Sequence, residues 1–68
     1  MEFKLRAPFV ELDNLLKALD LAANGAQAKQ CIQAGMVRVN GQVETRVRKK
    51  LRPGDTVEFE KQCISIAA

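Results

Sequence analysis

The sequence predicts an α+β fold, in which two N-terminal helices pack on a small, mostly antiparallel sheet. The main observation is a change of period: apolar residues recur every three to four positions from Leu12 to Gly35, and every second position from Met36 onward. Two short turn motifs in the second half support this division. With 68 residues, the chain is expected to form a single domain over residues 1–68.

The first half is expected to hold one short strand and both helices. Apolar and charged residues alternate in EFKLR at the start, which favours a strand. In VELDNLLKALDLA, four leucines fall at i, i+3, i+4 and i+7 and form one apolar face of a first helix. Asn24 is placed to cap a second helix, with Gln27 three residues later as in a capping box. Gly35 is placed to end it in a left-handed conformation.

The second half is expected to form the sheet. Asn40-Gly41 predicts a two-residue hairpin turn, and Pro53-Gly54 predicts the centre of a type II turn. TVEFE and QCISI are predicted to be two further strands. The predicted core includes all three phenylalanines and residues from each expected element: Phe3, Phe9, Leu12, Leu16, Val37, Val39, Val57, Phe59, Ile64 and Ile66.

The two cysteines, Cys31 and Cys63, lie far apart in different sequence contexts. A zinc site needs several thiolates or imidazoles, and the chain has no histidine, so no metal is expected. A disulfide between the two cysteines is an alternative that the sequence leaves open. We expect both cysteines to be small buried apolar residues, because free cysteine is usually buried.

The sequence has few of the residues that catalytic sites use. No histidine is present to activate a nucleophile, Ser65 is the only serine, and no glycine-rich phosphate loop occurs. We therefore expect no enzyme, no cofactor and no small-molecule substrate. No apolar run reaches the roughly 20 residues of a membrane span, and the N-terminus lacks the order of a signal peptide. A cytoplasmic location without membrane contact is the resulting prediction.

Charge is concentrated in one part of the chain. The net charge is +3, but the stretch from Val37 to Arg52 has six basic residues and only Glu44 as an acid, a local charge of +5. The rest of the chain carries a local charge of −2. Clustered Lys and Arg favour a polyanion, since binding releases condensed counterions and Arg can bind phosphate through two donors.

The spacing within this basic stretch predicts a shared surface. Arg46, Arg48 and Lys50 are two residues apart, so in an extended segment they point to one side, and Arg38 on a neighbouring strand could extend it. The chain has no Trp or Tyr, and its phenylalanines are assigned to the core. Capture of single strands commonly uses aromatic platforms, whereas structured RNA can be held through shape and phosphates. From charge alone, a solvated surface without a ligand is an equal alternative. If the segment binds RNA, structured RNA is the predicted ligand.

Two stretches, LDNLLKALDLAANGAQAKQCIQAGMVRVNG and KKLRPGDTVEF, resemble the RNA-binding domain named after ribosomal small-subunit protein S-four, the alpha-L type of motif. The resemblance covers about residues 11–59. The short length and NGAQAK are most similar to the stand-alone YbcJ-like proteins of bacteria. The resemblance implies a groove made by the second helix and the strand and loop after it, with ribosomal or transfer RNA among the possible ligands.

Carried over position by position, the resemblance implies a set of RNA-binding residues on the second helix, the hairpin strand and the basic loop: Gln27, Lys29, Gln30, Arg38, Arg46, Arg48, Lys49 and Lys50. Two departures matter. Many members have a basic residue where this chain has Glu11, and Ser-Arg where it has Asn24-Gly25. Both reduce the positive charge near the helices. Either RNA contact depends more on residues 46–50, or the chain prefers a different RNA.

Two alternatives remain from the sequence. The chain could be a protein-interaction module that docks on an acidic partner. VNGQV with LRPGDTVEF is also similar to the end of ubiquitin-like sulfur carriers. Those proteins finish in Gly-Gly, whereas this sequence finishes in Ile66-Ala67-Ala68 and places both helices before the hairpin.

Overall fold

The computed structural model describes all 68 residues and contains two helices and seven strands. The helices are α1 (Leu12–Ala18) and α2 (Gly25–Gln33). The strands are β1 (Glu2–Lys4), β2 (Val10–Glu11), β3 (Val37–Val39), β4 (Gln42–Val43), β5 (Lys50–Leu51), β6 (Thr56–Phe59) and β7 (Gln62–Ala67).

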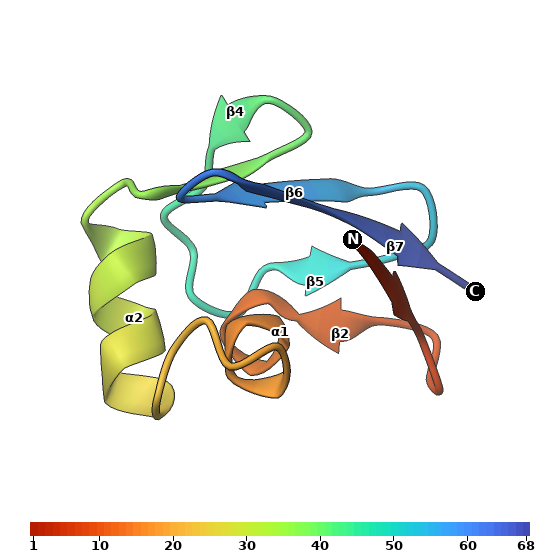
Figure 1. Ribbon diagram of the computed structural model, residues 1–68, viewed down its shortest axis with the longest axis horizontal. Helices are drawn as coiled ribbons and strands as arrows, with labels where there is room; N and C mark the ends of the chain where they lie inside the picture. Colours follow the sequence, from red (N-terminus) through yellow and green to blue (C-terminus); the bar gives the residue numbers. More distant parts are fainter.

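Five of the strands form one sheet in the order β1-β7-β6-β3-β4, and β2 and β5 form a separate antiparallel pair. Only β1 and β7 run parallel; every other neighbouring pair is antiparallel. Both helices and the β2–β5 pair lie on one side of the five-stranded sheet (Figure 1). The predicted α+β class, with two helices on a mostly antiparallel sheet, is confirmed.

The first helix is shorter than the leucine pattern predicts. The backbone is extended at β2 before the helix begins at Leu12, and Leu19 is already the C-cap. Asp20 follows with a φ of 57°, a left-handed conformation that ends the helical path. The chain then passes directly into the second helix. The leucine spacing identified the buried face but not the ends, because β2 pairing and the Asp20 turn set them.

The second helix begins and ends as predicted. The Asn24 side chain accepts a hydrogen bond from the Gln27 amide at 2.8 Å, and the Gln27 side chain accepts one from the Ala23 amide. These two bonds form a reciprocal cap one residue wider than the usual capping box. Gly35 has a φ of 78°, the left-handed region that glycine enters without a Cβ clash.

Both predicted turns are present. Asn40 and Gly41 have φ values of 53° and 83°, as in the type I′ turn that matches the twist of a hairpin. In the second turn, Gly54 has a φ of 96° and the Asp55 amide donates to the Arg52 carbonyl at 3.0 Å. This agrees with a type II turn.

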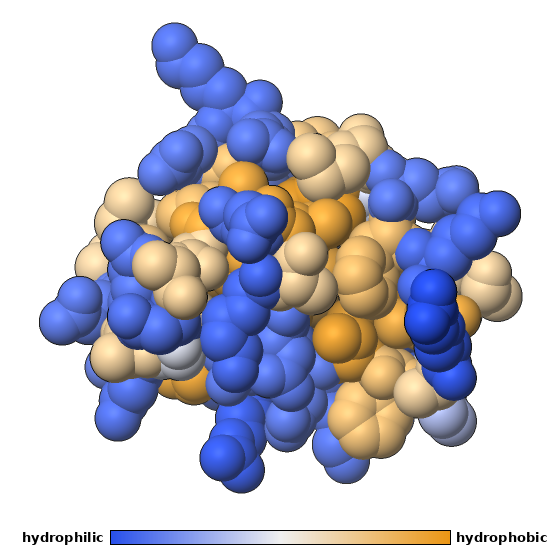
Figure 2. Space-filling view, turned by 60° about the horizontal axis from the view of Figure 1, so that its bottom comes forward, coloured by the Kyte–Doolittle hydropathy of each residue, from blue (hydrophilic) through white to orange (hydrophobic).

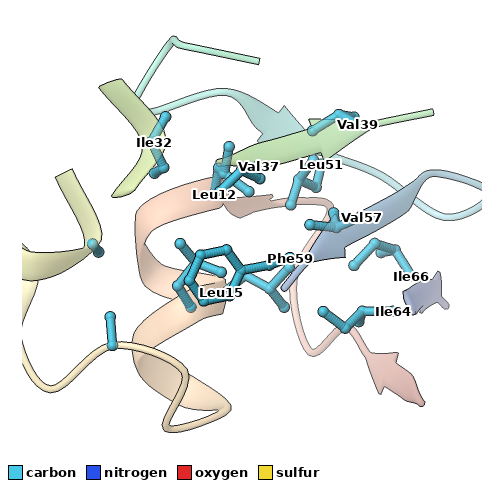
Figure 3. Packing of buried hydrophobic residues seen from close by; sticks show 13 residues of the cluster. Leu12, Leu15, Ile32, Val37, Val39, Leu51, Val57, Phe59, Ile64 and Ile66 are labelled. Carbon is cyan, nitrogen blue, oxygen red and sulfur yellow. The ribbon is translucent and has the colours of Figure 1, made fainter. Parts of the chain in front are cut away.

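Thirteen buried hydrophobic residues form a single core between the helices, β5 and the sheet (Figure 3). They are Leu12, Leu15, Leu16, Ala22, Ala28, Ile32, Val37, Val39, Leu51, Val57, Phe59, Ile64 and Ile66. Neither helix has the length and apolarity needed to cross a membrane.

Four residues that the sequence predicts to be buried are not fully buried. Cys63 is exposed, because it alternates with buried Ile64 along β7, and Cys31 is only half-buried; both thiols are free. Phe3 is half-buried but packs against the core. Phe9 is also half-buried, and it is not among the side chains that pack against the core.

Candidate nucleic-acid interface

The N-terminus of α1 holds the basic part of the chain in place. Glu11 is the N-cap residue, but its side chain makes no capping hydrogen bond. The first two helical amides instead donate to the loop before β5: the Leu12 amide to the Lys49 carbonyl at 2.9 Å, and the Asp13 amide to the Val47 carbonyl at 3.1 Å. The first amides of a helix lack partners within it. These two bonds therefore satisfy two amides of α1 and two carbonyls of the loop.

Two hydrophobic side chains of this loop point inward. Leu51 is completely buried, and Val47 is half-buried against the core. Between them the backbone turns, and the Lys49 amide donates to the Arg46 carbonyl at 3.3 Å. The extended conformation that the sequence predicts for this segment therefore occurs only at β5. With two carbonyls bound to α1 and two side chains in the core, the basic side chains between them are directed to the surface.

These three side chains and the two basic residues that flank Val47 and Leu51 line one surface hollow of about 440 Å³, which we call the basic hollow: Arg46, Arg48, Lys49, Lys50 and Arg52. No hydrophobic residue lines it. Arg52 is not among the contacts predicted from the sequence, although it follows Lys50 at the same two-residue spacing as the other predicted cations. Elsewhere, no three Cys, Asp or Glu side chains come together as a ligand set for a metal.

Arg46 differs from the other cations of the basic hollow because it is paired. Its Nε and one terminal nitrogen donate to the two Glu44 carboxylate oxygens at 3.0 and 3.1 Å, and its backbone amide donates to the same carboxylate. These hydrogen bonds lower the pKa of Glu44 and raise that of Arg46. Glu44 is therefore the one carboxylate that forms an ion pair with a cation of the hollow.

The far end of the basic hollow is fixed by Asp55. Its carboxylate accepts the Arg52 amide at 2.8 Å and the Asn40 side-chain amide at 3.1 Å, and both bonds lower its pKa. The Asn40 side-chain oxygen in turn accepts the Thr56 amide at 2.9 Å. Asn40 thus joins the hairpin turn to the turn after Arg52, so its side chain has a structural role.

The other predicted contacts do not line the basic hollow. Arg38 lies between buried Val37 and Val39 on β3, so its side chain is on the sheet face opposite the helices. Lys29 and Gln30 are exposed on α2, and their side chains form no hydrogen bond or ion pair, while the side-chain oxygen of Gln27 is used in the helix cap. The structure therefore separates the loop cations from the helix and strand residues that the resemblance grouped with them.

Comparison with known protein families gives a match over residues 3–67 to the model described as the S4 domain. The chain belongs to the S4 domain family. The match covers almost the whole sequence, including β1 and β7, which lie outside the resemblance drawn from residues 11–59.

Individual relatives agree with this assignment. The chain is 46% identical over 61 residues to a protein of Escherichia coli (strain K12) named "Putative RNA-binding protein YbcJ", covering 90% of this chain and 87% of that protein. The solution structure of YbcJ from E. coli, described as revealing an alfaL motif involved in RNA-binding, has a TM-score of 0.74 and 44% identity; the match covers 98% of this chain and 86% of that one. The small ribosomal subunit protein uS4 of Thermosipho africanus (strain TCF52B) is 37% identical over 51 residues, covering 75% of this chain and 24% of that protein.

The Asp55 contacts predict an acid-sensitive contribution to stability. Because the folded-state pKa is lowered, this contribution is fully present above the unfolded-state pKa, near 3.9, and is lost as the pH falls through the folded-state value. We expect Asp55→Asn to lower the free energy of unfolding by about 1 kcal/mol at pH 7. The difference from the parent should shrink below about pH 4, as measured by urea unfolding across pH. A difference independent of pH would contradict the role of the charge.

Proposed function

We propose that this protein binds structured RNA without catalysing a reaction, and that the basic hollow holds the RNA backbone. The observation that carries this proposal is the convergence of five basic side chains on one hollow that has no hydrophobic lining. Phosphate groups suit such a surface, because Lys and Arg attract them and Arg can donate two hydrogen bonds to one phosphate. The names of the YbcJ relative and of its solution structure, which refer to RNA binding, support the same function.

Within the basic hollow, we assign the main phosphate contacts to the cations that lack an acidic partner: Arg48, Lys49, Lys50 and Arg52. Arg46 is a weaker contact, because phosphate must compete with Glu44 for its guanidinium. Lys29 and Gln30 on α2 are contacts only for an RNA large enough to extend beyond the hollow. Arg38 is the least favoured, since it lies on the opposite face of the sheet.

A structured RNA is favoured because phosphate contacts of this kind recognise the position of a backbone rather than a sequence of bases. Ribosomal and transfer RNA are both candidates of this class. The sulfur-carrier alternative has no support in the comparisons, which match S4 domains over nearly the whole chain. A cytoplasmic location remains a prediction from the sequence.

The proposal predicts a salt-dependent affinity for a structured RNA hairpin. Four unpaired cations, each releasing about 0.9 counterion, give a slope of log affinity against log salt of roughly −3 to −4. Replacing Arg48 and Lys49 together by Gln should reduce this slope by about two and weaken binding at low salt. The measurement is a fluorescence anisotropy titration at several salt concentrations.

The matched control replaces Lys17 and Lys61 by Gln, which removes the same net charge from exposed positions outside the basic hollow. Its slope should stay within about half a unit of the parent. If the two double variants lose affinity equally, net charge alone explains binding, and the hollow is not the site.

The Glu44 pair predicts a contrast between neighbouring arginines. Arg48→Gln should weaken RNA binding several times more than Arg46→Gln, because only Arg46 already has its charge matched by a carboxylate in the free protein. The same anisotropy titration at low salt compares the two single variants. An equal or larger loss for Arg46→Gln would show that the Glu44 pair opens when RNA binds.

A further inference from the structure

Phe9 is an aromatic residue that the core does not explain. The preceding residue is Pro8, and the following one, Val10, packs against the core. Phe9 directly precedes β2, whose first residue, Val10, is the one that packs against the core. Its ring is half-buried without packing against the buried cluster. An aromatic side chain in such a position is available for a ligand.

The pairing of β2 with β5 places this ring beside the cations of the proposed RNA site. Val10 pairs with Leu51 and Glu11 with Lys50, and Phe9 directly precedes these paired residues of β2. The Lys50 ammonium lies over the Phe9 ring, 4.9 Å from its centroid. Both Lys50 and Arg52 line the basic hollow. Phe9 therefore lies at the border of that hollow.

A second hollow, of about 500 Å³, borders Phe9 and is largely apolar. It lies along the segment from β1 to β2 and is lined by Glu2, Phe3, Lys4, Leu5, Arg6, Ala7, Phe9 and Val10. On the face of the molecule that carries α1 and β2, hydrophobic surface is exposed between charged side chains (Figure 2). An apolar recess with Lys4 and Arg6 in its lining fits a flat ring attached to a negatively charged backbone.

We propose that Phe9 is a stacking platform for an unpaired base of the RNA whose phosphates occupy the basic hollow. The inference rests on the proposed function and specifies its ligand: a structured RNA with a bulged or looped-out nucleotide next to the bound backbone. A fully paired helix keeps its bases stacked inside and offers none to the ring. Lys50 over the ring, together with Lys4 and Arg6 in the lining of the recess, favours RNA over an apolar peptide.

Lys50 has a different partner in the free and bound states of this arrangement. In the free protein its ammonium is held by the face of the Phe9 ring. An exposed cation–π contact is weaker than the stacking of a base on an aromatic ring, so a base displaces the ammonium. Lys50 already lines the basic hollow, where the released ammonium can contact a phosphate.

The test uses two RNA hairpins with the same helix, one fully paired and one with a single bulged adenosine. Phe9→Leu keeps an apolar side chain but removes the aromatic face, and should weaken binding of the bulged hairpin by about tenfold. Binding of the paired hairpin should change by less than about twofold, with the salt slope unchanged for both. Equal effects on the two hairpins, or no effect on either, would overturn the stacking site.

The matched control is Phe3→Leu, the same substitution in the same recess at a ring that packs against the core. It should not discriminate between the hairpins. A second readout is Phe9→Trp, which introduces the only Trp into a chain without Trp or Tyr. Its fluorescence should be quenched by the bulged hairpin at saturation, and unchanged fluorescence would also overturn the site.

These experiments separate the two proposals. If the parent protein binds neither hairpin in a salt-dependent manner, the proposed function fails and the stacking site fails with it. If the parent binds both with the expected salt slope and Phe9→Leu does not discriminate between them, only the stacking site fails.

Discussion

The arrangement of the functional surface depends on two backbone amides in the first turn of α1. No side chain caps this helix, and the amides of Leu12 and Asp13 are satisfied by the carbonyls of Lys49 and Val47. A helix seven residues long gains little from its own hydrogen bonds, so it depends on these contacts and on its buried leucines. The same bonds fix the backbone of the basic loop, which otherwise has only two residues paired in a strand. One set of interactions therefore both completes the helix and positions the cations.

Bringing five basic side chains to one hollow is unfavourable in itself, because like charges repel. The buried side chain of Leu51 and the hydrogen bonds to α1 offset this repulsion, and Asp55 and Glu44 reduce it at the two ends of the loop. The remaining positive potential is not neutralised within the protein. A polyanion that enters the hollow relieves the repulsion and releases its own counterions. The repulsion among the basic side chains of the free protein therefore favours binding.

Much of the fold could be predicted from the sequence, because its signals are local. The Asn24 cap, the Gly35 terminus and both turns depend on residues within four positions of one another, and all are present. The end of α1 is set by the left-handed conformation of Asp20, which no turn motif in the sequence indicates. The start of α1 and the β2–β5 pair could not be predicted, since they depend on contacts between segments about 40 residues apart. For the same reason, the sequence indicated a shared basic surface in the loop but could not show that Arg38 faces away from it. A turn of the backbone, and not the expected extended segment, brings the loop cations together. Phe9 is assigned to the core on its residue type alone, because the sequence does not show the β2–β5 pairing or that Val10 is the residue that packs against the core.

The most direct test of the account follows the backbone amide signals of the ¹⁵N-labelled protein by NMR as a bulged RNA hairpin is added. The account predicts the largest shifts at residues 46–52 and at Phe9, together with Leu12 and Asp13, whose amides are bonded to the basic loop. Residues on the opposite sheet face, such as Arg38, Glu58 and Cys63, should shift little. Shifts concentrated on that sheet face, with residues 46–52 unchanged, would contradict the account.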